Sequence, residues 1–84
     1  MVLPEQPVTL TAEQIAALNR ELSTLRHDVN NHLSLILAAV EVIRAKPQMM
    51  EKMTGTLGEQ PPKISKAIQK FSTDFERAFG IKRD

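Results

Sequence analysis

Residues 15–43, IAALNRELSTLRHDVNNHLSLILAAVEVI, place apolar side chains at steps of three and four. This spacing lines up one stripe of an α-helix and is typical of a helix that packs against others in a bundle. The stretch therefore predicts an all-α protein. Written as heptads, position a holds Ile15, Leu22, Val29, Ile36 and Ile43, and position d holds Leu18, Leu25, His32 and Ala39.

The residues on either side of this stretch predict where its helix begins and ends. Thr11 is followed three residues later by Gln14, which is the spacing of a capping box. Pro47 cannot continue the helical hydrogen bonds and disfavours helical geometry in the residue before it. We therefore expect a helix over about residues 12–46, an extended arm over residues 1–10 and a turn near Pro47.

A second apolar pattern covers about residues 48–79 and is interrupted by Pro61 and Pro62. Leu57 and Ile64 lie on opposite sides of the prolines, yet they are seven residues apart. Because the heptad phase survives, we expect one long helix that is kinked or briefly broken at the prolines. The pattern includes Met50, Met53, Leu57, Ile64, Ala67, Ile68, Phe71, Phe75, Ala78 and Phe79.

Two helices of similar length joined by a short turn form an antiparallel hairpin, here over residues 11–80 with residues 81–84 as a tail. A chain of 84 residues buries little of its surface when it folds alone. We therefore expect the hairpin to pair with a second copy as a homodimeric four-helix bundle.

The amino-acid composition argues against several classes of function and site. The formal net charge is +1 and acidic and basic residues are interspersed, so no basic surface for nucleic acid is expected. There is no Cys, which excludes disulfides and thiolate metal sites and is typical of the cytoplasm. The longest apolar run, LILAAVEVI, is too short to span a bilayer, and no secretion signal is recognisable at the start. We expect a soluble cytoplasmic protein that does not bind membranes.

Residues 26–32, RHDVNNH, crowd polar side chains into the middle of the first helix. Asp and Asn each cost a helix interior roughly 0.5 kcal/mol relative to Ala, so helix stability alone does not explain them. His27 falls at heptad position f, which faces away from the bundle, with Asp28 beside it and Asn31 one turn further on. An exposed imidazole is a good nucleophile, a carboxylate can orient it, and an amide can hold water or a phosphoryl oxygen.

The other polar residues receive different interpretations. Arg20, Thr24, Asn30 and Ser34 are candidate partner-binding residues around His27. His32, at position d, points into the bundle and is expected to set its register rather than react. The five-residue step separates the two imidazoles around the helix, so no metal site is expected.

The segment His27 to Leu33, HDVNNHL, resembles the H-box of the dimerisation and histidine-phosphotransfer domain of sensor histidine kinases. In that family an acidic residue follows the phosphorylated His, an Asn or Thr comes four positions after it and a Leu six after. Asp28, Asn31 and Leu33 match these positions. The variant with H-D-x-N-N is similar to stand-alone sporulation-type phosphotransferases.

The resemblance implies a helical hairpin that dimerises, over about residues 12–80. His27 would carry the phosphoryl group, Asp28 would be its acid/base partner and Asn31 would position water. The family commonly has Pro where this chain has His32. The Asn-rich and Gly-rich boxes of the ATP-binding domain have no counterpart in these 84 residues. Autonomous kinase activity is therefore not expected, and the phosphoryl group would come from another protein.

Sequence reasoning thus favours a histidine phosphotransfer protein that exchanges a phosphoryl group between His27 and an Asp of a response regulator, without a cofactor of its own. Its partners would be a second copy, a receiver domain and a histidine kinase. Two alternatives stay open. One is a catalytically silent dimeric adaptor that binds a kinase or regulator, and the other is a purely structural coiled coil.

Overall fold

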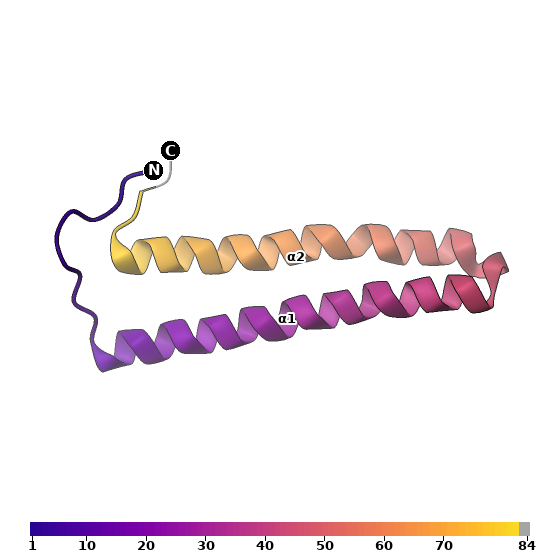
Figure 1. Ribbon diagram of the computed structural model, residues 1–84, viewed down its shortest axis with the longest axis horizontal. Coiled ribbons are helices and arrows are strands. Elements are labelled where there is room, and N and C mark those ends of the chain that lie inside the picture. Colours follow the sequence, from indigo (N-terminus) through magenta and orange to yellow (C-terminus); the bar gives the residue numbers. More distant parts are fainter. Residues whose placement is uncertain (83–84) are drawn as a thin grey trace.

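The computed structural model describes residues 1–82, which form a hairpin of two long antiparallel helices (Figure 1). Helix α1 covers Ala12–Ala45, a short 3₁₀ helix η1 covers Pro47–Met49, and helix α2 covers Met50–Phe79. The hairpin is flat and elongated, with extents of 58 × 28 × 12 Å. The predicted all-helical hairpin is confirmed. Residues 83 and 84 of the expected tail lie outside the described part.

The capping box at the start of α1 is present as predicted. The Thr11 hydroxyl oxygen accepts from the backbone N–H of Gln14 at 3.1 Å, and the Gln14 amide oxygen accepts from the Thr11 N–H at 2.8 Å. Two N–H groups that a helix start leaves without partners are thereby satisfied. At the other end the Lys46 N–H still donates to the Val42 carbonyl at 2.7 Å, and Pro47 then begins the turn.

Helix α2 runs through Pro61 and Pro62 as a single element. Neither proline nitrogen can donate a hydrogen bond, so the carbonyls of Leu57 and Gly58 lose their usual partners four residues on. The apolar phase predicted one helix that is kinked or briefly broken at the prolines; the single helix is confirmed, and the brief break is absent. The helix stays continuous because its apolar stripe packs along α1 on both sides of the prolines.

The two ends of the chain meet beyond the last turn of α2. Gly80 adopts a left-handed conformation with φ 68°, and the Ile81 N–H donates to the Glu76 carbonyl at 2.8 Å. Val2 then pairs with Lys82 through two antiparallel backbone hydrogen bonds of 2.6 and 2.9 Å. The expected extended arm is thus tied back to the end of α2, a contact that the sequence pattern did not predict (Figure 1).

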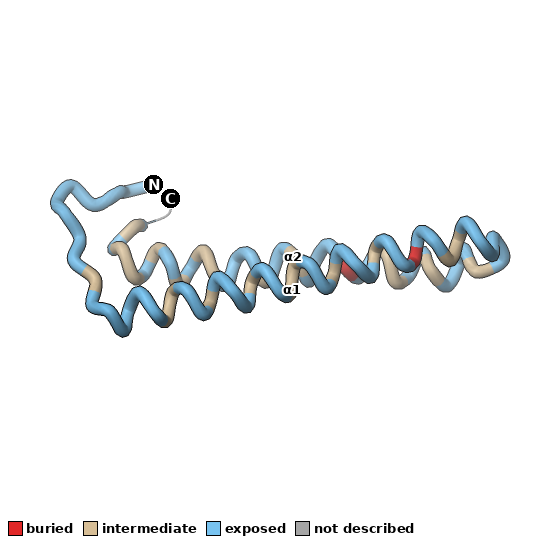
Figure 2. The backbone as a smooth tube through the Cα atoms, turned by 60° about the horizontal axis from the view of Figure 1, so that its bottom comes forward, coloured by how far each residue is buried: buried red, intermediate tan, exposed pale blue. Residues whose placement is uncertain are grey.

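The core of the hairpin is thin. Within residues 1–82 only Ala39, at 2% exposure, and Gln60, at 3%, are buried (Figure 2). The residues at heptad position d of α1 all pack against α2, whereas Ile15 and Leu22 at position a stay exposed. In a pair of helices, each helix covers only one side of the apolar stripe of the other. Within one chain, the apolar residues at heptad positions a and d of α1 are therefore only partly covered.

Candidate functional site

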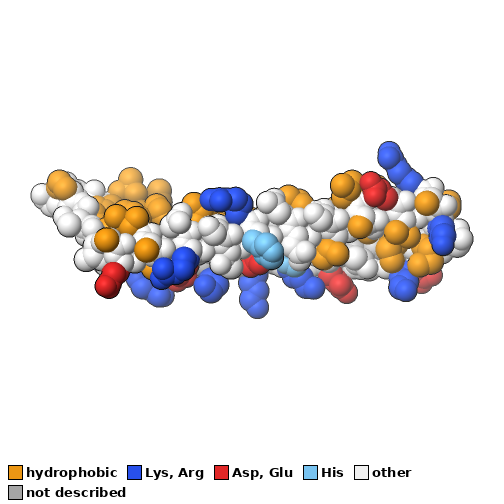
Figure 3. Space-filling view, turned by 90° about the horizontal axis from the view of Figure 1, so that it is seen from below, with side chains coloured by type: hydrophobic (Ala, Val, Ile, Leu, Met, Phe, Trp, Pro, Cys, Tyr) orange, Lys and Arg blue, Asp and Glu red, His pale blue; other side chains and the backbone are white. Residues whose placement is uncertain are grey.

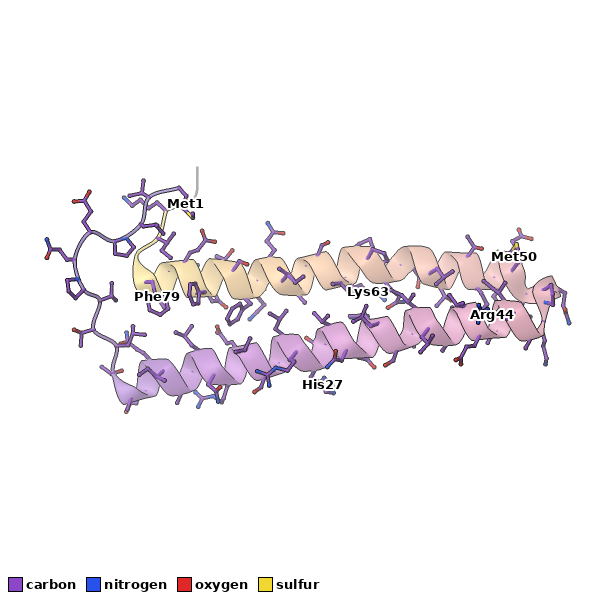
Figure 4. The ribbon with its side chains drawn as sticks, viewed as in Figure 1. Met1, His27, Arg44, Met50, Lys63 and Phe79 are labelled. Carbon is purple, nitrogen blue, oxygen red and sulfur yellow. The ribbon has the colours of Figure 1, made fainter. Side chains whose placement is uncertain are left out.

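His27 stands on the outer side of α1, near the middle of the hairpin (Figure 4). Its side chain is 83% exposed, and its Nδ1 atom lies 3.5 Å from the Asp28 carboxylate oxygen Oδ1. The Asp28 side chain is about half exposed. The predicted exposure of His27, and its position beside a carboxylate, are confirmed.

This geometry makes the two nitrogens of the imidazole inequivalent. Nδ1 faces Asp28, so a carboxylate at that distance favours the tautomer with its proton on Nδ1. In that tautomer Nε2 carries the lone pair. An exposed imidazole beside a carboxylate that can orient its ring is arranged as a nucleophile.

A groove of about 390 Å³ lies between the helices beside Asp28. Helix α1 contributes Arg20, Thr24 and Asp28 to its walls, and helix α2 contributes Lys70 and Phe71. Cationic, acidic, hydroxyl and aromatic groups therefore face one concave surface. The remaining wall residues are Ala17, Glu21, Leu25 and Ala67. His27 is not a wall residue, so its imidazole stands just outside the groove.

The structure separates the four predicted partner-binding residues into two pairs. Arg20 and Thr24 share the groove with Asp28. Asn30 and Ser34 are exposed on α1 but do not line that groove. Asn31 is exposed one turn beyond His27, and no hydrogen bond joins the two side chains among the described residues.

His32 lies between the helices, as its heptad position predicted. Its Nδ1 atom is 2.7 Å from the side-chain amide oxygen of Gln60 on α2. Sequence reasoning missed Gln60 and Lys70, and it assigned Phe71 to the apolar pattern of the second helix rather than to a groove. A signal for Gln60 was present, because it lies seven residues from both Met53 and Ala67 and so replaces an apolar residue in the stripe of α2.

The described residues 1–82 contain neither a metal-ligand cluster nor a membrane-spanning helix. No group of three or more His, Cys, Asp or Glu side chains there is close enough to hold a metal ion. Neither helix contains an apolar stretch long enough to cross a bilayer over its described residues.

A comparison with known protein families, curated proteins and solved structures found no match to this chain.

Proposed function

We propose that this chain is a histidine phosphotransfer protein of two-component signalling, which exchanges a phosphoryl group between His27 and an Asp of a response regulator. The observation that carries the proposal is the 83% exposed imidazole with a carboxylate oxygen 3.5 Å from its Nδ1 atom. The likeness of residues 27–33 to an H-box supports the same reaction.

The transfer step uses the free nitrogen of His27. The Nε2 lone pair attacks the phosphorus of an aspartyl phosphate, so that an N–P bond forms while the P–O bond to the Asp carboxylate breaks. The carboxylate leaves with the electron pair of that bond. The proton on Nδ1 stays beside Asp28, whose negative charge stabilises the phosphorylated, positively charged ring. The reverse step returns the phosphoryl group to the regulator.

The groove beside Asp28 offers a surface on which a receiver domain can dock. Phe71 provides apolar area and Arg20 provides a cationic group toward an acidic phosphorylation site, while the Lys70 ammonium lies 3.5 Å from the Asp74 carboxylate. Because His27 stands at the rim of this groove, a docked domain could bring its phosphoaspartate to the imidazole. The Mg²⁺ required at the phosphoaspartate would belong to the regulator.

The uncovered apolar surface supports a homodimeric four-helix bundle. One chain exposes 6618 Å², whereas a compact protein of this mass exposes roughly 5000 Å². The excess exceeds the ~800 Å² that each partner buries in a standard interface. The exposed apolar side chains, each 37–59% accessible, include Leu22, Leu33, Leu37 and Val40 on α1 and Ile68 and Phe75 on α2.

A second copy can cover this surface without covering His27. Leu22 and Leu33 lie roughly 120–140° around α1 from His27, counted at 3.6 residues per turn. Seen from the outer side of α1, most Lys and Arg lie along the lower edge, whereas apolar side chains lie along the upper edge in the left part and spread across the face in the right part (Figure 3). Identical apolar stripes on two hairpins suit a two-fold symmetric pairing that leaves each imidazole in solvent.

The phosphotransfer proposal is tested by labelling. The purified chain is incubated with radiolabelled phosphoramidate and, separately, with a receiver domain phosphorylated on its Asp. We expect label that is labile in acid and stable in base, located on His27 by peptide mapping. Binding of the receiver domain without any label would instead favour the silent adaptor. Neither binding nor label would favour a structural coiled coil.

The dimer proposal is tested by placing charges on the apolar stripe. We expect Leu22→Glu combined with Leu33→Glu to weaken association by about 100-fold or more, because a symmetric interface would bury four unpaired carboxylates. Sedimentation equilibrium should show two chains for the native protein and one for the variant. Ala16→Glu combined with Ala38→Glu is the control, since both alanines are exposed on the side of α1 that carries His27. A variant that stays dimeric would place the interface elsewhere.

A further inference from the structure

The contact between His32 and Gln60 joins the two helices at mid-length through their most buried polar side chain. The His32 Nδ1 atom and the Gln60 amide oxygen are 2.7 Å apart, and Gln60 is only 3% exposed. The amide nitrogen of Gln60 donates to the Thr56 carbonyl at 3.2 Å. No buried side-chain nitrogen or oxygen within residues 1–82 is left without a partner.

These two hydrogen bonds determine which atom donates and which accepts in the contact between His32 and Gln60. The bond to Thr56 uses the amide nitrogen of Gln60, so the amide oxygen must face His32. An amide oxygen can only accept, and His32 therefore donates from Nδ1. The same bond forms whether the ring is neutral or protonated. The contact is thus a directional link between α1 and α2, and its geometry does not depend on the charge of His32.

The link is attached to the part of α2 that is least stable as a helix. Gly55 and Gly58 each cost about 1 kcal/mol relative to Ala, and each interior proline costs about 3 kcal/mol. A Cβ atom at either glycine would meet nothing within 4 Å, so close packing does not require these glycines. Gln60 directly precedes Pro61 and Pro62, where two backbone hydrogen bonds are missing. A specific side-chain link at this point holds α2 against α1 where backbone bonding is weakest.

On α1 the link lies five residues from His27, the proposed phosphoryl carrier, which is about 1.4 helical turns. His32 comes four residues after Asp28, on the same side of the helix, and one residue after Asn31. Fixing the His32 side chain therefore fixes the rotation of the turn that carries His27 relative to Lys70 and the groove wall on α2.

We propose that His32 and Gln60 are positioning residues for phosphotransfer: their hydrogen bond holds the His27 turn of α1 in the orientation that a receiver domain docked in the groove requires. This inference rests on the proposed phosphotransfer function. It goes beyond it by assigning a role to a pair of side chains that the reacting groups do not touch. Small misplacements of reacting atoms can cost up to about 100-fold in rate, so a link of this kind has a measurable consequence.

Two phosphoryl donors distinguish a positioning role of the His32–Gln60 pair from a role in the chemical step. Phosphoramidate is small and needs only an exposed imidazole, whereas a phosphorylated receiver domain must dock in a defined orientation. The main variant is His32→Leu combined with Gln60→Leu, because removing both partners leaves no unsatisfied polar group and should preserve folding. The second variant exchanges the pair, His32→Gln with Gln60→His, and restores a hydrogen bond between the helices.

We expect the double leucine variant to keep its helix content and its oligomeric state. Its labelling rate with phosphoramidate should stay within about twofold of the native protein, while transfer from the receiver domain falls by on the order of tenfold. The exchanged pair should recover most of the receiver rate. In the native protein, NMR should show His32 protonated on Nδ1 with a slowly exchanging ring proton.

Each contrary result has a distinct meaning. An unchanged receiver rate in the double leucine variant, an equal fall with both donors, or no recovery in the exchanged pair would overturn the positioning role alone. Absence of label from both donors in the native protein would overturn the phosphotransfer function and the positioning role with it.

Discussion

Replacing His27 with Gln is expected to abolish phosphoryl labelling entirely, with phosphoramidate and with a phosphorylated receiver domain alike. The Gln side chain is polar and fits an exposed helix position, but its amide nitrogen lone pair is delocalised and does not attack phosphorus. Because the His27 side chain is 83% exposed, and Asp28 is its only ion-pair partner among the described residues, the substitution should change the free energy of unfolding by less than about 0.5 kcal/mol. Labelling kinetics and thermal melting by circular dichroism measure the two effects.

Two controls make this loss specific. Ser23 lies one turn before His27 on the exposed surface of α1. The Ser23→Ala variant should leave labelling unchanged. His32→Gln removes the second imidazole and should still be labelled by phosphoramidate. Label that persists in His27→Gln, or that maps to His32, would show that the exposed imidazole is not the phosphoryl carrier.

Replacing Ala39 with Asp should have the largest effect on folding. Ala39 is 2% exposed in α1. A carboxylate there would be buried without a partner, which costs about 3–5 kcal/mol. For a domain of this size that corresponds to a fall in melting temperature of more than about 10 °C. Circular dichroism at the helical minimum follows the transition.

The neighbouring residue provides a matched control. Ala38 is in the same helix and is exposed, so Ala38→Asp carries the same loss of helix propensity without burial. We expect this variant to melt within a few degrees of the native protein. Equal destabilisation at the two alanines would mean that α1 and α2 do not pack around Ala39 as the structure describes.

Most of the architecture could be predicted because it depends on local patterns. Apolar residues at steps of three and four predicted both helices, and the Thr11 capping box and Pro47 predicted the bounds of α1 to within a residue. The same register predicted that His27 is exposed and that His32 faces α2. Each of these properties follows from helix geometry alone.

The groove could not be predicted in this way. Lys70 and Phe71 face Arg20 and Thr24 only because the η1 turn sets how far α2 slides along α1. A slide of one turn would bring other residues of α2 beside Asp28 at no cost to either helix pattern. For the same reason Asn30 and Ser34, which the sequence grouped with Arg20 and Thr24, lie outside the groove.

By itself the amino-acid sequence determined two helices, their ends and the exposed place of His27, because hydrogen bonding and side-chain direction in a helix repeat over a few residues. The tertiary structure decided which side of each apolar stripe is covered, that Gln60 meets His32, and that the arm returns to Lys82. These contacts join residues 28 and more positions apart. Their free energy depends on how two preformed helices pack, which no local pattern specifies.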